Sequence, residues 1–103
     1  MTREEALQAL AAYRDQIDAV DRRLLELLNE RTQVVEHIGR VKREARLPIY
    51  EPKREDEVFR NVTEHNGGPL PVDAVKRIFE RIIDEMRKVQ RERMETQADG
   101  ASE

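Results

Sequence analysis

Arg31 is the residue of this sequence whose surroundings most directly indicate chemistry, because it stands inside an otherwise apolar helical stripe. The apolar members recur at spacings of three and four residues and are Leu10, Tyr13, Ile17, Val20, Leu24, Leu27, Val34, Ile38 and Val41. This spacing is typical of one face of an amphipathic helix. A guanidinium stays charged and is costly to bury without an anion. The position therefore indicates either an internal carboxylate partner or an anionic ligand held between helices.

Four further polar residues share helical faces with apolar ones. Lys42 follows Arg31 at a spacing of three helical turns plus about 20°, so the two cations project from nearly one face, roughly 16 Å apart. Arg54 and Glu55 adjoin the apolar side of a second segment, and Gln90 ends the apolar row of a third. These residues predict one interior site that grips a small dianion. Taken singly, each also fits a structural role, such as a charge at a dimer seam or a lysine whose ammonium reaches solvent.

Arg14 gives a different indication, because it lies on the same helix as Arg31 but about 25 Å away along the axis. It cannot contact the same small ligand from the same helix. The two histidines, His37 and His65, have no partners at metal-ligand spacing, so no metal site is predicted.

Three helices are predicted to position these residues, so the expected fold class is all-α. The first runs from about Arg3 to about Arg46, without proline, and ends before Leu47-Pro48. The second begins at Glu51-Pro52 and ends near Glu64, before the turn sequence at 66–71. The third runs from Val72-Asp73 to about Met94. Residues 1–94 are thus predicted to form one helical domain, and 95–103 a disordered C-terminal tail.

The length of the first helix predicts an intertwined homodimer. A helix of roughly 40 residues spans about 60 Å, whereas a compact chain of this size has a radius of gyration of about 13 Å. Charged residues make up 40% of the sequence and aromatic residues only 4%, so one copy has little material for a core. A second chain is expected to cover the helix.

Composition excludes several classes of function. The 19 basic residues are outnumbered by 22 acidic ones, which gives a net charge of -3. The chain therefore has no overall positive charge to attract nucleic acid, and nucleic-acid binding is not expected. Cysteine is absent, so disulfides and thiolate chemistry are excluded. No apolar run reaches the length of a membrane span, and the N-terminal residues do not look like a secretion signal. The expected location is cytoplasmic.

In order and spacing, four stretches resemble the all-helical chorismate mutases. They are YRDQID with Arg14, LLELLNERTQVVEHIGRVK from Leu24 to Lys42, YEPKRE from Tyr50 to Glu55, and IFERIIDEMRKVQ ending at Gln90. The resemblance covers about residues 5–92. It implies an intertwined homodimer of three-helix chains, with two buried sites that share the long helix. It also implies that Arg14 enters the site from the partner subunit, which agrees with the distance argument.

The resemblance implies a role for each matching residue in the conversion of chorismate to prephenate, without a metal or cofactor. Arg14 from the other chain, Arg31 and Arg54 would bind the two carboxylates of chorismate. Lys42 and Gln90 would hydrogen-bond the ether oxygen, on which negative charge develops as the C–O bond breaks. Glu55 would accept a hydrogen bond from the ring hydroxyl.

Two positions depart from the family pattern. Glu51 stands where many relatives have aspartate, and its substrate contact is expected mainly through the backbone. Met86 stands where some relatives place a hydroxyl, so it is expected to pack against the substrate or to fill the core.

Two other functions and one partner remain open from the sequence. Isochorismate-pyruvate lyases use the same scaffold and a similar cationic pocket, and a non-enzymatic helical dimerisation module would also explain the apolar stripe. The segment HNGGPLP and the helix after it resemble mutase domains attached to a synthase of the early shikimate pathway. This second resemblance makes such a synthase a candidate partner.

Overall fold

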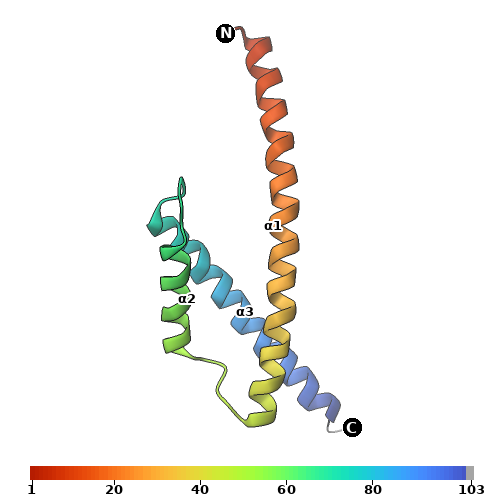
Figure 1. Ribbon diagram of the computed structural model, residues 1–103. Coiled ribbons are helices and arrows are strands. Elements are labelled where there is room, and N and C mark those ends of the chain that lie inside the picture. Colours follow the sequence, from red (N-terminus) through yellow and green to blue (C-terminus); the bar gives the residue numbers. More distant parts are fainter. Residues whose placement is uncertain (102–103) are drawn as a thin grey trace. The chain divides into compact units, whose positions relative to one another are not determined.

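The computed structural model describes residues 1–101, with the side chains of residues 1–93. It consists of three helices in the order α1 (Arg3–Ala45), α2 (Pro52–Glu64) and α3 (Val72–Ala101), which Figure 1 shows along the chain. No strand occurs in residues 1–101, so the predicted all-α class is confirmed. The chain divides into two units, Met1–Gln33 and Val34–Glu103, which are described separately below.

The unit Met1–Gln33 contains the first three quarters of α1. Thr2 caps this helix: its hydroxyl accepts a hydrogen bond from the Glu5 N–H at 3.1 Å and donates one to the Glu5 carboxylate at 3.0 Å. Large apolar side chains along this stretch are exposed, including Leu10, Ile17 and Leu24. The predicted amphipathic helix is therefore present, and its apolar face is uncovered within the chain.

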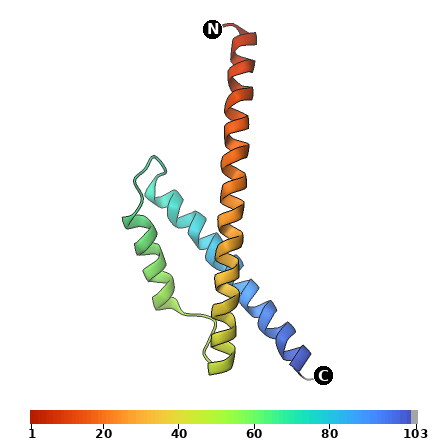
Figure 2. The same cartoon turned by 45° about the vertical axis from the view of Figure 1, so that its right-hand side comes forward.

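The unit Val34–Glu103 contains the end of α1 together with α2 and α3. Helices α2 and α3 lie side by side, as both views of the ribbon show (Figures 1 and 2). Its buried apolar residues are Val35 on α1 and Val75, Ile83 and Met86 on α3. Lys42 and Gln90 are buried as well, which makes this unit the one that holds a polar interior.

Local signals end α1 and begin α2 close to where the sequence predicts. Arg46 adopts a left-handed conformation with φ 57°, and the Leu47 N–H donates to the Lys42 carbonyl at 2.7 Å, so the helix terminates before Pro48. Pro52 occupies the first turn of α2. The side chain of Glu51 makes no capping hydrogen bond to α2, which leaves its carboxylate available for another partner.

The third helix is longer than predicted. The sequence placed its end near Met94, but α3 continues to Ala101, because residues 95–101 contain strong helix formers and no proline. Residues 102–103 and the side chains of 94–101 lie outside the described residues, so the predicted disordered tail over 95–103 stays a prediction. Within the described residues, no helix combines the length and apolar character that crossing a membrane would require.

Candidate active site

Lys42 is the centre of the candidate site, and the periodicity of α1 explains its burial. The buried residues of α1 are Val35, Gly39 and Lys42, spaced by four and three residues along one face. Only 7% of Lys42 is exposed. A charged side chain this deep needs compensating partners, since an unpaired buried ammonium is strongly destabilising.

Three acceptors surround the Lys42 ammonium. Its Nζ lies 2.7 Å from Oε1 of Glu51, 3.0 Å from the carbonyl oxygen of Ile49 and 3.3 Å from Oε1 of Gln90. An ammonium carries three N–H donors, so each has an acceptor. The Glu51 carboxylate balances the charge. Because the Glu51 side chain is 48% exposed, it is the partner that is most open to exchange.

Gln90 reaches Lys42 from α3 because the two helices approach closely at Gly39. A Cβ added at Gly39 would lie 3.6 Å from Cγ of Gln90 and 3.9 Å from its Cα. The single glycine of α1 therefore faces the backbone of α3 at this point. Since the Gln90 carbonyl oxygen accepts from Lys42, its NH₂ group is the part that remains to donate to a ligand.

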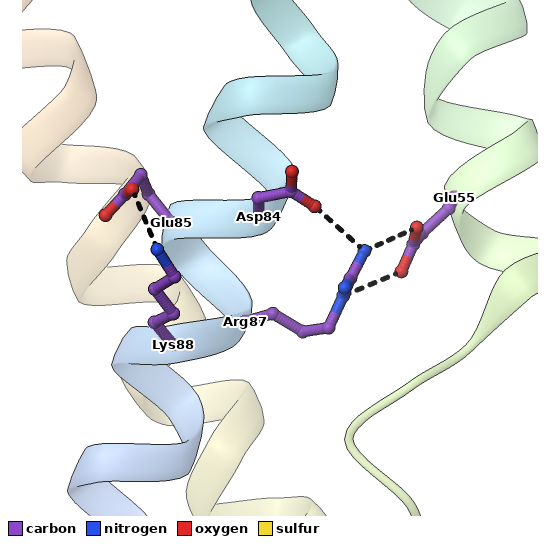
Figure 3. A network of polar contacts seen from close by, with 5 residues as sticks. All are labelled: Glu55, Asp84, Glu85, Arg87 and Lys88. Atoms are coloured by element: carbon purple, nitrogen blue, oxygen red, sulfur yellow. Dashed lines mark hydrogen bonds and ion pairs between the residues drawn. The ribbon is translucent and has the colours of Figure 1, made fainter.

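Glu55, on the first turn of α2, belongs to a second polar cluster, which is drawn in Figure 3. Arg87 on α3 donates to Glu55 through two hydrogen bonds, Nε to Oε2 at 3.2 Å and Nη2 to Oε1 at 3.0 Å. Nη2 of Arg87 also lies 3.3 Å from Oδ1 of Asp84, and Cζ of Arg87 lies 5.3 Å from the ring centroid of Tyr50. Tyr50 is the residue between Ile49 and Glu51, which both bind Lys42.

Sequence reasoning missed Arg87 and Tyr50. A signal for Arg87 was present, because it lies three residues before Gln90 and four after Ile83, on the edge of the apolar face of α3. Tyr50 carries no such signal, since it lies in the loop between α1 and α2, where helical periodicity does not apply.

The other predicted site residues are placed differently. Arg54 is exposed and pairs with Glu57 of its own helix at 3.2 Å, without a described contact to Lys42 or Gln90. Met86 is buried with 8% exposure and is part of the apolar core of α3. Arg14 and Arg31 belong to the unit Met1–Gln33, where Arg14 is exposed and Arg31 is half-buried. Their participation in a site with Lys42 stays a prediction.

The cluster around Lys42 and Gln90 supplies a buried cation and an amide donor, and the second cluster supplies the Glu55 carboxylate, which Arg87 holds. Such a set can bind a small anion that also carries a hydroxyl group. Among residues 1–93, no group of three or more His, Cys, Asp or Glu residues has the arrangement of a metal site.

Comparison with known proteins gives a consistent set of relatives. The family model described as chorismate mutase type II matches residues 13–91. A bifunctional chorismate mutase/prephenate dehydratase of Aquifex aeolicus is 38% identical over 81 residues, which is 75% of this chain and 22% of that protein. The chain therefore spans about a fifth of the length of this relative.

Two solved structures match this chain over most of its length and over most of their own length. Chorismate mutase (Form II) from Thermus thermophilus has a TM-score of 0.79 and 36% identity, and the match covers 81% of this chain and 94% of that one. Chorismate mutase from Helicobacter pylori, solved in complex with prephenate, has a TM-score of 0.79 and 28% identity, with coverage of 85% and 96%. Since the family model matches most of the sequence and the fold agrees, the chain belongs to the chorismate mutase type II family.

Proposed function

We propose that this chain catalyses the rearrangement of chorismate to prephenate. The observation that carries the proposal is the buried contact between Lys42 and Gln90, which places a cation and an amide on facing helices. Membership of the chorismate mutase type II family supports the same reaction. The reaction is intramolecular, because one C–O bond breaks and one C–C bond forms within a single molecule.

Stabilisation of the ether oxygen is the main task of the site. Negative charge develops on this oxygen as the C–O bond breaks ahead of C–C bond formation. Lys42 and the NH₂ group of Gln90 donate to it from a buried position, where hydrogen bonds to developing charge are stronger than in water. Because both donors are held in place beforehand, little reorganisation accompanies the reaction.

Substrate binding requires Lys42 to exchange one of its three acceptors. Glu51 is the most exposed of them, so we infer that the substrate takes its place beside the ammonium. Ile49 contributes a backbone carbonyl and Gln90 a buried amide, and both remain as fixed partners. This exchange leaves the Lys42 ammonium with three hydrogen-bond acceptors in both states.

The two carboxylates of chorismate are assigned to Arg14, Arg31 and Arg54. Arg54 supports this assignment, because its ion pair with Glu57 is exposed on both sides and is therefore readily exchanged for a substrate carboxylate. Arg14 is exposed on α1 and is assigned to the site of the partner subunit. Glu55 accepts from the ring hydroxyl. Met86, which is buried in the apolar core of α3, either packs against the substrate or only fills the core.

The homodimer is proposed because α1 leaves a long apolar face uncovered. The exposed fractions of its side chains include 57% for Ile17, 51% for Leu24 and 62% for Leu27. Covering such side chains contributes about 25 cal/mol per Å² of apolar surface removed from water. A second copy of the same helix offers a matching face and is the proposed occupant.

We place the activity in aromatic amino-acid biosynthesis, in the cytoplasm. The Aquifex relative is named for a chorismate mutase joined to a prephenate dehydratase, an enzyme of the class that consumes the product. A synthase of the early shikimate pathway remains a candidate protein partner, on the resemblance of residues 65–71 and the helix after them.

Product analysis tests the proposed function directly. The purified chain is incubated separately with chorismate and with isochorismate, and the products are identified by mass spectrometry. Formation of prephenate from chorismate is expected. Release of pyruvate from isochorismate alone would instead make the chain a lyase, and no turnover of either compound would leave a dimerisation module.

A further inference from the structure

Arg87 contacts three residues from different parts of the chain, and the proposed reaction assigns it no role. It joins Glu55 on α2, Asp84 on α3 and the ring of Tyr50 in the loop before α2. We propose that Arg87 is a positioning residue of the active site: it holds the Glu55 carboxylate in the orientation that recognises the ring hydroxyl of the substrate. This inference rests on the proposed mutase function.

The geometry of the pair supports an orienting role. Figure 3 shows the Arg87 side chain reaching from α3 to Glu55, with two dashed lines to the same carboxylate. A bidentate contact fixes both the position and the plane of the carboxylate, which a single contact to lysine does not. A glutamate side chain otherwise samples several rotamers, so the pair removes freedom that substrate binding would have to remove.

Burial separates this pair from the other ion pairs of α3. The side chains of Arg87 and Glu55 are 27% and 21% exposed, whereas those of Arg81 and Glu85 are 72% and 48% exposed. Exposed pairs contribute little to structure, because water and salt screen them. Among residues 1–93, Arg93 also pairs with Glu36 on another helix, but Arg93 is 61% exposed, so the Arg87 pair is the better shielded link between helices.

Glu55 keeps the capacity to bind a hydroxyl while Arg87 holds it. Each carboxylate oxygen has two acceptor positions, and Arg87 uses one on each oxygen. One position on each oxygen therefore remains. Because Glu55 accepts and does not transfer a proton, its task is recognition.

Arg87 also supports the loop that carries the Lys42 partners. Its guanidinium lies over Tyr50, whose neighbours Ile49 and Glu51 both accept from Lys42. A change at Arg87 is therefore expected to be felt at two points of the site. The larger effect is expected at Glu55, which Arg87 contacts directly through two hydrogen bonds.

This role predicts a specific division between KM and kcat. The hydroxyl contact is made in both the bound substrate and the transition state, so its loss weakens binding without changing the chemical step. Arg87→Met should raise KM for chorismate roughly tenfold, while kcat stays within about twofold. Loss of folded protein would do the opposite, lowering the apparent kcat at constant KM.

Three further variants complete the test. Arg81→Met removes an exposed cation from the same helix and should leave KM unchanged. Arg87→Lys keeps the charge but loses the bidentate contact, so KM should rise by about threefold. This milder variant replaces Arg87→Met in the test if Arg87→Met fails to fold. In a Glu55→Gln background, Arg87→Met should add less than about twofold to KM, because both changes act on one contact.

The possible results separate the two proposals. If the unaltered chain forms no prephenate, the proposed function is wrong and the role of Arg87 falls with it. Suppose instead that the unaltered chain is active and that every folded Arg87 variant, Arg87→Lys included, has the same KM as the unaltered chain. Then only the proposed role of Arg87 is wrong. Additive effects of Arg87→Met and Glu55→Gln on KM would equally overturn it.

Discussion

Lys42 shows how a buried charge is kept available at the scale of a single residue. Its ammonium is surrounded by a carboxylate, a backbone carbonyl and an amide oxygen, so its burial is compensated without a ligand. The compensating carboxylate of Glu51 is half exposed and can return to water. The arrangement thus favours a site that binds anions by exchange of partners.

Replacement of Lys42 should abolish most of the catalysis. Lys42→Ala removes the charged donor from the ether oxygen, and we expect kcat to fall roughly 10²-fold or more. The fold should survive, because the only charge left without its partner, that of Glu51, is half exposed. Lys88→Ala, which removes an exposed lysine of α3, is the matched control. Near-normal turnover in a helical Lys42→Ala protein would contradict the assigned role.

Gln90 allows a test by pH. Its amide donates at any ordinary pH, so the activity of the unaltered chain should vary little across the neutral range. In Gln90→Glu the carboxyl group donates only when it is protonated, and glutamate has an ordinary pKa of about 4.3. The activity of this variant should therefore rise as the pH falls. The rate is measured from pH 5 to pH 8, and a flat profile would remove Gln90 from the site.

At the scale of the helices, Gly39 decides how closely α1 approaches α3. Glycine inside a helix lowers its stability, but Gly39 faces Gln90 directly. A methyl group at this position would make an ordinary contact at 3.6 Å from Cγ of Gln90. The site thus has room for one additional carbon atom and not for a branched side chain.

Two substitutions at Gly39 should act in opposite directions. Gly39→Ala should raise the free energy of unfolding by up to about 1 kcal/mol, because alanine favours the helix and fits the available space. Gly39→Leu should displace Gln90 and lower both stability and activity. Urea denaturation and the mutase assay measure the two effects. Destabilisation by Gly39→Ala would show that the helices approach more closely than described.

At the scale of the whole molecule, the main feature is the apolar face of α1, which stays exposed to water in a single chain. Tyr13, Ile17 and Leu27 are each more than half exposed. Arg14 lies beside this face and makes no described ion pair. A second copy would cover the face and bring Arg14 toward the partner's site, which is the arrangement proposed above.

Mixing two inactive variants tests this arrangement. Arg14→Ala and Lys42→Ala chains should each form inactive homodimers, but their heterodimer has one doubly altered site and one intact site. With random pairing, half of the dimers are mixed and half of their sites are intact, so co-refolding should restore about a quarter of the original activity. Mass spectrometry measures the fraction of mixed dimers. Mixed dimers without activity would contradict the contribution of Arg14 across the interface.

The sequence by itself determined the helices and several of their ends. The stripe through α1, Pro48 after it and Pro52 at the start of α2 act over a few neighbouring residues, so they can be recognised from spacing alone. Lys42 was found because it shares a helical face with Arg31, and Gln90 because it ends an apolar row; the structure brings the two side chains into contact. The end of α3 was predicted too early, since no strong stop signal marks it.

Only the tertiary structure decided how the polar groups pair. Glu51 binds Lys42 through its side chain, whereas the sequence led us to expect a backbone role in substrate binding. Arg87 binds Glu55 across a separation of 32 residues and lies over Tyr50. Such pairs depend on the crossing of helices and on the path of a loop. Neither is encoded in local periodicity, because many partners of suitable charge are available to each side chain until packing selects one.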